Sequence, residues 1–189
     1  MIYIIRHGQT ALNKARALQG RSDLPLNEAG IAEAEAAGKA LEERGIRISR
    51  VFSSPLVRAV RTAELAAPGV IIETDDRLLE MDYGPYEGID LKDPPPEIRF
   101  FFSDFVNNPA PEGMEQLADV VKRAGSFLED IKDIGGDILV STHAIAMKGL
   151  LEYLTPGSNG SYWAKRIGNC DIYYSDFNEG GKGVPQKLE

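Results

Sequence analysis

The stretch Met1-Ile2-Tyr3-Ile4-Ile5-Arg6-His7-Gly8 is a run of β-forming residues that stops at a polar, glycine-containing turn. It predicts a first strand that ends at Arg6, with His7 held just beyond its carboxyl end. A second such run, residues 137–142, ends directly before His143, the only other histidine in the chain. In α/β proteins, ligands bind at the carboxyl ends of the strands. The two histidines therefore indicate one shared active site.

Predicted strands and helices alternate outward from this first strand. We expect further strands and helices over residues 27–45 (helix), 49–53 (strand), 55–66 (helix), 70–73 (strand), 115–132 (helix), 138–141 (strand), 144–153 (helix) and 170–177 (strand), with helical potential over 10–18. Such alternation predicts a three-layer α/β/α sandwich with a mostly parallel central sheet. The last strand is expected to be antiparallel, at an edge. Residues 180–183 are expected to be flexible or to form a hairpin turn.

Residues 82–115 depart from this alternation, with Gly84-Pro85, Gly88 and a run of three prolines at 94–96. We interpret them as a cap-like segment, a loop with a short helix over the strand ends, within a single domain that spans residues 1–189. Four phenylalanines in this segment predict either an apolar substrate wall or an anchor for the helix. We favour the anchor for all four: Phe100, Phe101, Phe102 and Phe105.

Bulk composition narrows the class of protein. A net charge of −8 argues against a nucleic-acid partner but is compatible with a small anionic substrate. The single cysteine, Cys170, excludes a disulfide framework or a multi-cysteine metal site, and we expect it to be buried in the last strand. The first residues contain no basic n-region, so we expect a first strand there rather than a signal peptide, and no run approaches the roughly 20 apolar residues of a membrane helix. A cytoplasmic protein without a membrane partner is expected.

Two arginines are placed to bind an anion. Arg6 precedes His7, and its planar fork of donors suits phosphate oxygens, while Gly8 lets a ligand approach the backbone. Arg58 is expected in the first turn of the helix that follows Ser54-Pro55. A cation is mildly unfavourable there unless an anion shares the site. The alternative is that both arginines are solvated and merely cover apolar surface.

Three carboxylates compete for the role of an acid or base. Glu80, Asp82 and Glu87 all lie among aromatic residues and glycines after the third predicted strand. A carboxyl group shielded by Met81 and Tyr83 could hold a raised pKa and donate a proton near neutral pH. The local sequence does not choose among the three, and a loop acid is usually just solvated.

In this order and with these spacings, the elements resemble the histidine phosphatase superfamily, also called the phosphoglycerate mutase-like family. The likeness runs from residue 1 to about 154 and rests on Arg6-His7-Gly8-Gln9-Thr10, Asn13, Gln19-Gly20, Asp23-Leu24-Pro25-Leu26, Gly30, Ser53-Ser54-Pro55-Leu56, Arg58, Ala59, Thr62, Glu80, Tyr83-Gly84, Glu87-Gly88 and Val140-Ser141-Thr142-His143. Each piece is weak alone, whereas the joint pattern is specific. Two departures are Ala144, where a glycine commonly follows, and residues 111–115, a loose version of the family's Gly-Glu-Ser region.

The resemblance implies that His7 is a nucleophile that forms a phosphohistidine, with Arg6, Arg58 and a protonated His143 around the phosphoryl group. It also implies that Glu80 is the general acid and base. Contacts with phosphate or substrate are implied for five more residues, namely Asn13, Gln19, Gly20, Tyr83 and Ala144. No metal or other cofactor is implied, because the arginines and the second histidine supply the charge that phosphoryl transfer needs.

The expected function is a metal-independent phosphatase of a small phosphorylated metabolite, such as a sugar phosphate, phosphoglycerate or the nucleotide-loop precursor of cobalamin. The interval from Glu80 to His143 is short, whereas the resembling mutases carry a longer insertion, and an open pocket favours water as the acceptor. Phosphoglycerate mutase-type transfer is the nearer alternative. A non-catalytic phospho-ligand-binding module is disfavoured by retention of the core side chains. A Rossmann nucleotide-binding protein is discounted because Arg-His-Gly follows the first strand.

Overall fold

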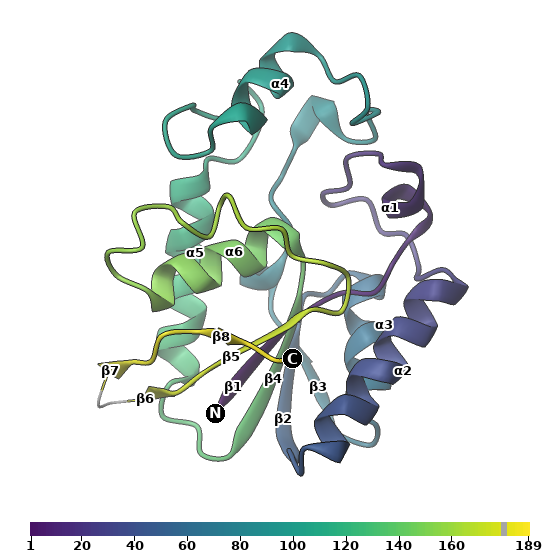
Figure 1. Ribbon diagram of the computed structural model, residues 1–189, viewed down its shortest axis with the longest axis vertical. Coiled ribbons are helices and arrows are strands. Elements are labelled where there is room, and N and C mark those ends of the chain that lie inside the picture. Colours follow the sequence, from purple (N-terminus) through teal and green to yellow (C-terminus); the bar gives the residue numbers. More distant parts are fainter. Residues whose placement is uncertain (179–180) are drawn as a thin grey trace.

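The computed structural model describes residues 1–178 and 181–189. Its centre is a six-stranded sheet with strand order β3-β2-β4-β1-β5-β8 (Figure 1). The strands are β1 (Ile2–Arg6), β2 (Ile48–Ser53), β3 (Ile72–Thr74), β4 (Asp137–Thr142), β5 (Ile172–Ser175) and β8 (Gln186–Lys187). The first four are mutually parallel, and β5 runs antiparallel to β1. The mostly parallel sheet is thus confirmed, although β8 lies outside β5, which is therefore not the edge strand.

Helices cover both faces of the sheet (Figure 1). They are α1 (Ala11–Ala15), α2 (Glu28–Glu43), α3 (Val57–Ala66), α4 (Pro96–Ser103), α5 (Leu117–Ile131) and α6 (Ala144–Leu154), with 3-10 turns η1 (Asp76–Leu78) and η2 (Gly84–Tyr86). Helices α2 and α3 pack on one face, and α5 and α6 on the other. The expected three-layer sandwich is confirmed. None of the helices in the described part of the chain has the length and apolar character to cross a membrane.

The first strand shows why this sequence forms the centre of the sheet. Ile2 and Ile4 pack with α5 and α6, whereas Tyr3 and Ile5 pack with α2 and α3. All four are at most 6% exposed. Successive side chains of a strand point to opposite faces, and a strand covered on both faces is apolar at every position. The continuous apolar run of β1 is therefore what its position requires.

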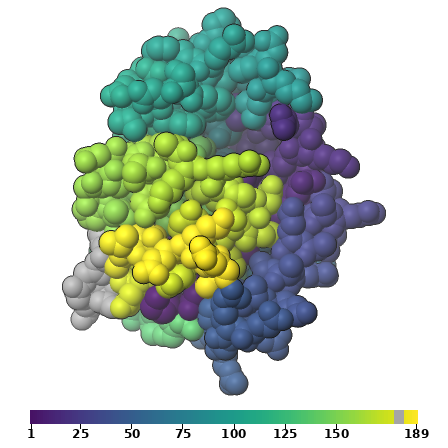
Figure 2. All heavy atoms as spheres, in the orientation of Figure 1, coloured from purple at the N-terminus to yellow at the C-terminus, as the bar shows by residue number. Residues whose placement is uncertain are grey.

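The segment of residues 82–115 lies over the carboxyl ends of the parallel strands and carries α4 (Figure 1). Its atoms belong to the teal region at the top of the molecule in Figure 2. Phe101 is fully buried and packs with Ile98, so it anchors the helix as expected. Phe100 is 58% exposed and anchors nothing. Phe102 and Phe105 also pack, partly buried, against this cluster, and they line a cavity as well. Of the four expected anchors, the expectation is therefore wrong for Phe100.

Several local predictions differ from the structure at element ends. Helix α1 stops at Ala15, because Arg16 adopts a left-handed conformation with φ of 61°. Helix α3 begins at Val57 rather than at the expected Pro55. Cys170 is partly exposed and precedes β5, so its expected place in the strand is wrong. The turn expected at residues 180–183 falls partly outside the described residues, and beside it β6 (Phe177–Asn178) pairs with β7 (Gly181–Lys182).

Candidate active site

The two histidines meet because β1 and β4 are neighbouring parallel strands that end in register. Arg6 is paired with Thr142, and the backbone N–H of His7 donates to the Thr142 carbonyl over 2.9 Å. His143 follows Thr142 and caps α6. The two imidazole centroids are 5.1 Å apart, and the residues are 3% and 0% exposed. The expected convergence of His7 and His143 is therefore observed.

The backbone fixes the tautomer of His7. Its Nδ1 lies 2.7 Å from the Gly8 carbonyl oxygen, which only accepts, so Nδ1 carries the hydrogen. Its Nε2 accepts a hydrogen bond from the Arg58 Nε over 3.3 Å and therefore carries no hydrogen. Burial, reinforced by Arg6 and then by Arg58, holds the pKa of His7 well below its ordinary value. The ring is therefore neutral, and Nε2 is its unprotonated nitrogen.

His143 is oriented by two neighbours. Its Nδ1 accepts from the same Arg58 Nε over 3.2 Å, so its Nε2 donates to the Ser54 hydroxyl over 2.8 Å. Burial lowers the pKa of His143 well below its ordinary value, and Arg58, His7 and Arg6 lower it further. The expectation of a protonated His143 is therefore wrong for the pocket as it stands. Sequence reasoning missed Ser54 as an orienting residue, although it belongs to the Ser-Ser-Pro-Leu motif.

Arg58, the second residue of α3, links the two histidines, and we call His7, His143 and Arg58 the floor of the site. Arg58 is fully buried, and its Nη1 and Nη2 donate to the carbonyls of Ser22 and Gly20 over 2.7 and 2.5 Å. Thr62, one turn later, donates to the Arg58 carbonyl and accepts from the Gly8 N–H. The expected place of Arg58 in the first turn of a helix is observed. Gly20, expected at the substrate, instead helps to hold Arg58.

A cavity of about 320 Å³ opens above His7, and we call it the His7 cavity. Its lining includes seven of the ten residues expected at the site, namely Arg6, His7, Asn13, Gln19, Glu80, Tyr83 and Ala144. Apolar side chains complete it: Ala17, Leu18, Leu91, Phe102, Phe105 and Ile145. Arg58, His143 and Gly20 are not part of this lining. The structure thus separates the expected residues into a lining and a buried layer behind His7.

Two buried N–H donors of the lining have no hydrogen-bond partner among residues 1–178 and 181–189. They are the Nε of Arg6 and the Nε2 of Gln19. The Arg6 Nη1 donates to the Ile167 carbonyl, and the Gln19 Oε1 accepts from the Thr10 hydroxyl and from Asn13. Burial lowers the pKa of Arg6, with Glu80 and Tyr83 opposing this shift. Unpaired buried donors need acceptors, and phosphoryl oxygens would satisfy them.

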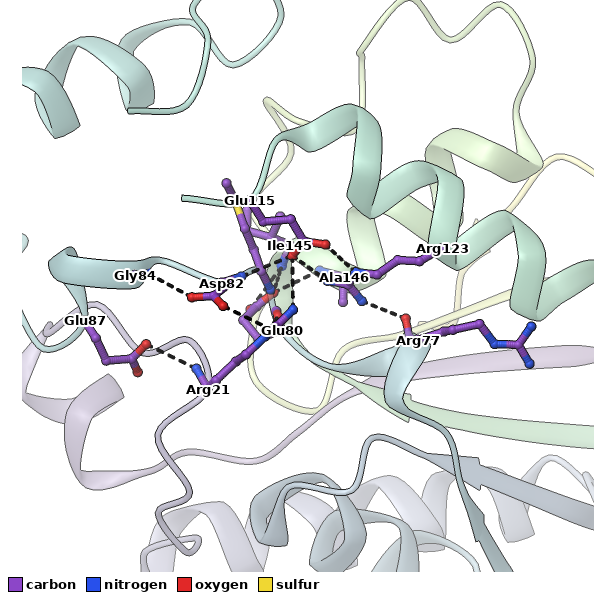
Figure 3. Close-up of polar contacts among 11 residues, drawn as sticks. Arg21, Arg77, Glu80, Asp82, Gly84, Glu87, Glu115, Arg123, Ile145 and Ala146 are labelled. Atoms are coloured by element: carbon purple, nitrogen blue, oxygen red, sulfur yellow. Dashed lines mark hydrogen bonds and ion pairs between the residues drawn. The ribbon is translucent and has the colours of Figure 1, made fainter. Parts of the chain in front are cut away.

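Among the three competing carboxylates, only that of Glu80 lines the His7 cavity. Its Oε1 accepts from the backbone N–H groups of Met81, Ala146 and Ile145 over 2.9, 3.0 and 3.1 Å (Figure 3). Two of these donors belong to the first turn of α6, whose partial positive charge stabilises a carboxylate. Asp82 pairs with Arg21, and Glu87 accepts from the Gly20 N–H and from Ser22. The structure therefore distinguishes Glu80 from Asp82 and Glu87, which the local sequence could not do.

An ion pair clamps the chain on both sides of Glu80 (Figure 3). The Arg123 Nε donates to the Glu115 Oε1 over 2.7 Å, and both side chains are largely buried. Arg123 also donates to the carbonyl of Arg77, three residues before Glu80. Glu115 accepts from the Asp82 N–H, two residues after it. Sequence reasoning missed this clamp, because Glu115 lies in the region that matches the family only loosely.

No cluster of three or more His, Cys, Asp or Glu side chains is placed to hold a metal ion in the described residues.

Two histidines at the ends of neighbouring strands of a mostly parallel α/β sheet are the arrangement that the resemblance to the histidine phosphatase superfamily implies. The family model of the histidine phosphatase superfamily (branch 1) matches residues 2–186. The chain belongs to this superfamily.

Three relatives illustrate the range within the family. The chain is 31% identical to a probable phosphoglycerate mutase, GpmB, of Yersinia pestis (strain Pestoides F), over 94% of this chain and 85% of that protein. A phosphoglycerate mutase from Thermus thermophilus is 27% identical, with a TM-score of 0.77 over 100% of this chain and 98% of that one. A phosphoserine phosphatase from Entamoeba histolytica, solved with 3-phosphoglyceric acid, has a TM-score of 0.84 at 23% identity, over 100% and 96%. That last likeness concerns the fold alone.

Proposed function

We propose that the protein is a metal-independent phosphatase that hydrolyses small phosphate monoesters through a phosphohistidine at His7. The observation that carries the proposal is the fixed tautomer of His7. Its Nδ1–H is held by the Gly8 carbonyl, which leaves the Nε2 lone pair beside the Arg58 guanidinium. His7 lines the same cavity as Glu80 and Arg6. A nucleophile, an acid and a cation therefore share one site.

The first half-reaction transfers the phosphoryl group to His7. The Nε2 lone pair forms a bond to phosphorus as the bond from phosphorus to the ester oxygen breaks, and Glu80 gives its proton to that oxygen. The Glu80 Oε2 accepts one hydrogen bond, over 3.2 Å from the Ile145 N–H, and this donor is shared with Oε1. The Oε1 atom accepts from three backbone N–H groups. Oε2 is therefore the oxygen that we assign to carry the proton. The alcohol leaves, and Glu80 is then ionised.

The second half-reaction releases phosphate. Glu80 takes a proton from water as the water oxygen attacks phosphorus, the P–N bond breaks, and His7 recovers its neutral ring. The Arg6 Nε and the Gln19 Nε2 are free to donate to the phosphoryl oxygens. Phosphoryl transfer depends mainly on positioning and on charge stabilisation, which Arg6 and Arg58 would supply. The scheme assigns no step to a metal ion.

The choice of acceptor separates a phosphatase from a mutase. Water enters an open cavity, and one wall of the His7 cavity consists of Leu91, Phe102 and Phe105 from the cap segment. Leu91 is 37% exposed, which supports access of solvent. Phosphoglycerate mutase-type transfer is the second candidate, because the Yersinia relative and the Thermus structure carry that name. A small phosphorylated metabolite is the proposed substrate in either case.

The test is phosphate release over a panel of metabolite phosphates and p-nitrophenyl phosphate, with wild type and His7→Ala side by side in excess EDTA. We expect wild-type turnover with EDTA present and a loss of at least about 1,000-fold in the variant, as for removal of a covalent nucleophile. Incubation with 3-phosphoglycerate and 2,3-bisphosphoglycerate would yield free phosphate from a phosphatase and 2-phosphoglycerate from a mutase. Lack of turnover across the whole panel would indicate a non-catalytic binding module.

A further inference from the structure

A second hollow lies behind the apolar wall of the His7 cavity. Its volume is about 500 Å³, and it lies between residues 102–106 of the cap segment and residues 163–166. We call it the Lys148 hollow. It shares Phe102 and Phe105 with the His7 cavity, so these two rings, with centroids 5.4 Å apart, border both hollows. The two hollows are therefore neighbours rather than separate surface features.

One face of α6 links the two hollows. Ala144 and Ile145 line the His7 cavity, and Lys148, one turn later, lines the second hollow. Residues three and four positions apart share a helix face, so the three side chains follow one another along α6. Burial lowers the pKa of Lys148, while the charge of Glu80 opposes this shift and that of Arg6 adds to it, so the ammonium group lies within the field of the candidate active site.

The Lys148 hollow carries an excess of positive charge. Its lining contains Lys148, Lys165 and Arg166 but one carboxylate, Asp104. That carboxylate already accepts hydrogen bonds from Asn107 and a neighbouring backbone N–H. None of the three cations forms an ion pair with any residue that the structure describes. The hollow is therefore suited to an anion that the chain does not provide.

Lys148 is a largely buried cation at the Lys148 hollow, where no carboxylate pairs with it among the described residues. It is 9% exposed, its Nζ donates to the Trp163 carbonyl over 2.7 Å, and it lies 5.4 Å from the centroid of the Phe105 ring. An ammonium group has three donors, so two remain for a ligand. Burial lowers the pKa of Lys148 to about 8, so most of it is still charged at neutral pH. A buried cation without an anion destabilises the fold, and a purely structural role would be filled better by an apolar side chain.

We propose that the Lys148 hollow binds a second anionic group, a carboxylate or a phosphate, at the far end of a substrate whose phosphate ester lies at His7. This inference rests on the proposed function and specifies its substrate class, namely small phosphomonoesters that carry acid groups at both ends. Phe102 and Phe105 lie between the two binding points and contact the carbon chain of such a substrate. Lys148 is then a residue that determines specificity and takes no part in the chemical step.

The test compares two open-chain six-carbon substrates that differ in one acid group, 6-phosphogluconate and sorbitol 6-phosphate. We expect wild type to have a higher kcat/KM for 6-phosphogluconate. Lys148→Met should lower that value by about 10- to 100-fold, the effect of losing a hydrogen bond to a charged group, and change sorbitol 6-phosphate by less than about 2-fold. Lys148→Arg should retain most of the preference. Lys122→Met, on α5 and outside both hollows, is the matched control and should change neither substrate.

Three outcomes would overturn the inference: no preference in wild type, equal loss for both substrates in Lys148→Met, or no loss for either. Titration calorimetry of both ligands with His7→Ala measures the same preference without turnover. If Lys148→Met does not fold, the exposed pair Lys165→Gln/Arg166→Gln should still show a selective loss of several-fold for 6-phosphogluconate. Failure of the proposed function is a separate result, because wild type would then not hydrolyse p-nitrophenyl phosphate.

Discussion

The floor and the outer wall of the His7 cavity are built in opposite ways. On the floor, His7, Arg58 and His143 are at most 3% exposed, and every ring nitrogen has a hydrogen-bond partner. The wall consists of Leu91, Phe102 and Phe105 from the irregular cap segment, and Leu91 is 37% exposed. Packed strand ends hold groups in fixed positions, whereas surface segments tolerate change. The proposed chemistry therefore resides in the floor, and the choice of substrate in the wall.

After loss of His7 itself, the largest effect is expected for Arg58→Lys on the floor. Lysine keeps the charge but loses the planar fork that reaches both histidines and the carbonyls of Gly20 and Ser22. We expect kcat/KM for p-nitrophenyl phosphate to fall by at least about 100-fold, as when a preorganised donor is removed. Arg61→Lys on the exposed side of the same helix is the control. A variant with nearly full activity would show that the floor is not the fixed part of the site.

A smaller effect is expected where the floor meets the cap, for Glu115→Ala. This change removes the partner of Arg123 and the acceptor of the Asp82 N–H, so the chain around Glu80 is less firmly held. We expect kcat to fall by about 10-fold for glucose 6-phosphate, whose alcohol needs a proton to leave, and much less for p-nitrophenyl phosphate. Glu112→Ala, exposed in the same loop, is the control. Equal losses for both substrates would argue against a role in positioning Glu80.

The floor should also make stability depend on pH. The pKa values of His7 and His143 are lowered in the folded state, so the unfolded chain binds more protons below the unperturbed pKa of about 6.5. The free energy of unfolding should therefore fall as the pH falls, by about 1 kcal/mol per histidine between about pH 7 and about pH 5.5. Urea denaturation at both pH values measures this. The slope should decrease in His143→Gln, and an unchanged slope would contradict the assignment.

The smallest effect is expected on the wall, for Phe102→Ala. The ring is partly exposed and lines both hollows, so its loss removes contact area from the substrate and leaves the floor intact. We expect KM for a metabolite phosphate to rise by about 3-fold with little change in kcat, as for loss of binding made equally in ground and transition states. Phe100→Ala, 58% exposed, should have no effect. A large fall in kcat would place the wall in the chemical machinery.

The sequence predicted the centre of the fold well and its periphery poorly. Buried strands and amphipathic helices leave clear patterns, and the apolar run before Arg6 was correctly predicted to be a strand, which the structure shows to be covered on both faces. The exact starts of α3 and β5 depend on backbone geometry that periodicity does not record. The position of β8 beyond β5 depends on a pairing of only two residues, which leaves almost no signal in the sequence.

The sequence by itself determined that His7 and His143 follow two strands and that their motifs resemble those of the histidine phosphatase superfamily. Tertiary structure alone decided that Arg58 donates to both rings, that Ser54 orients one of them and that Glu80 faces the cavity. The physical reason is the distance along the chain between the residues that interact. Strand and helix patterns arise from neighbours in the chain, whereas these contacts join residues dozens of positions apart and exist only after the sheet has brought its strand ends together.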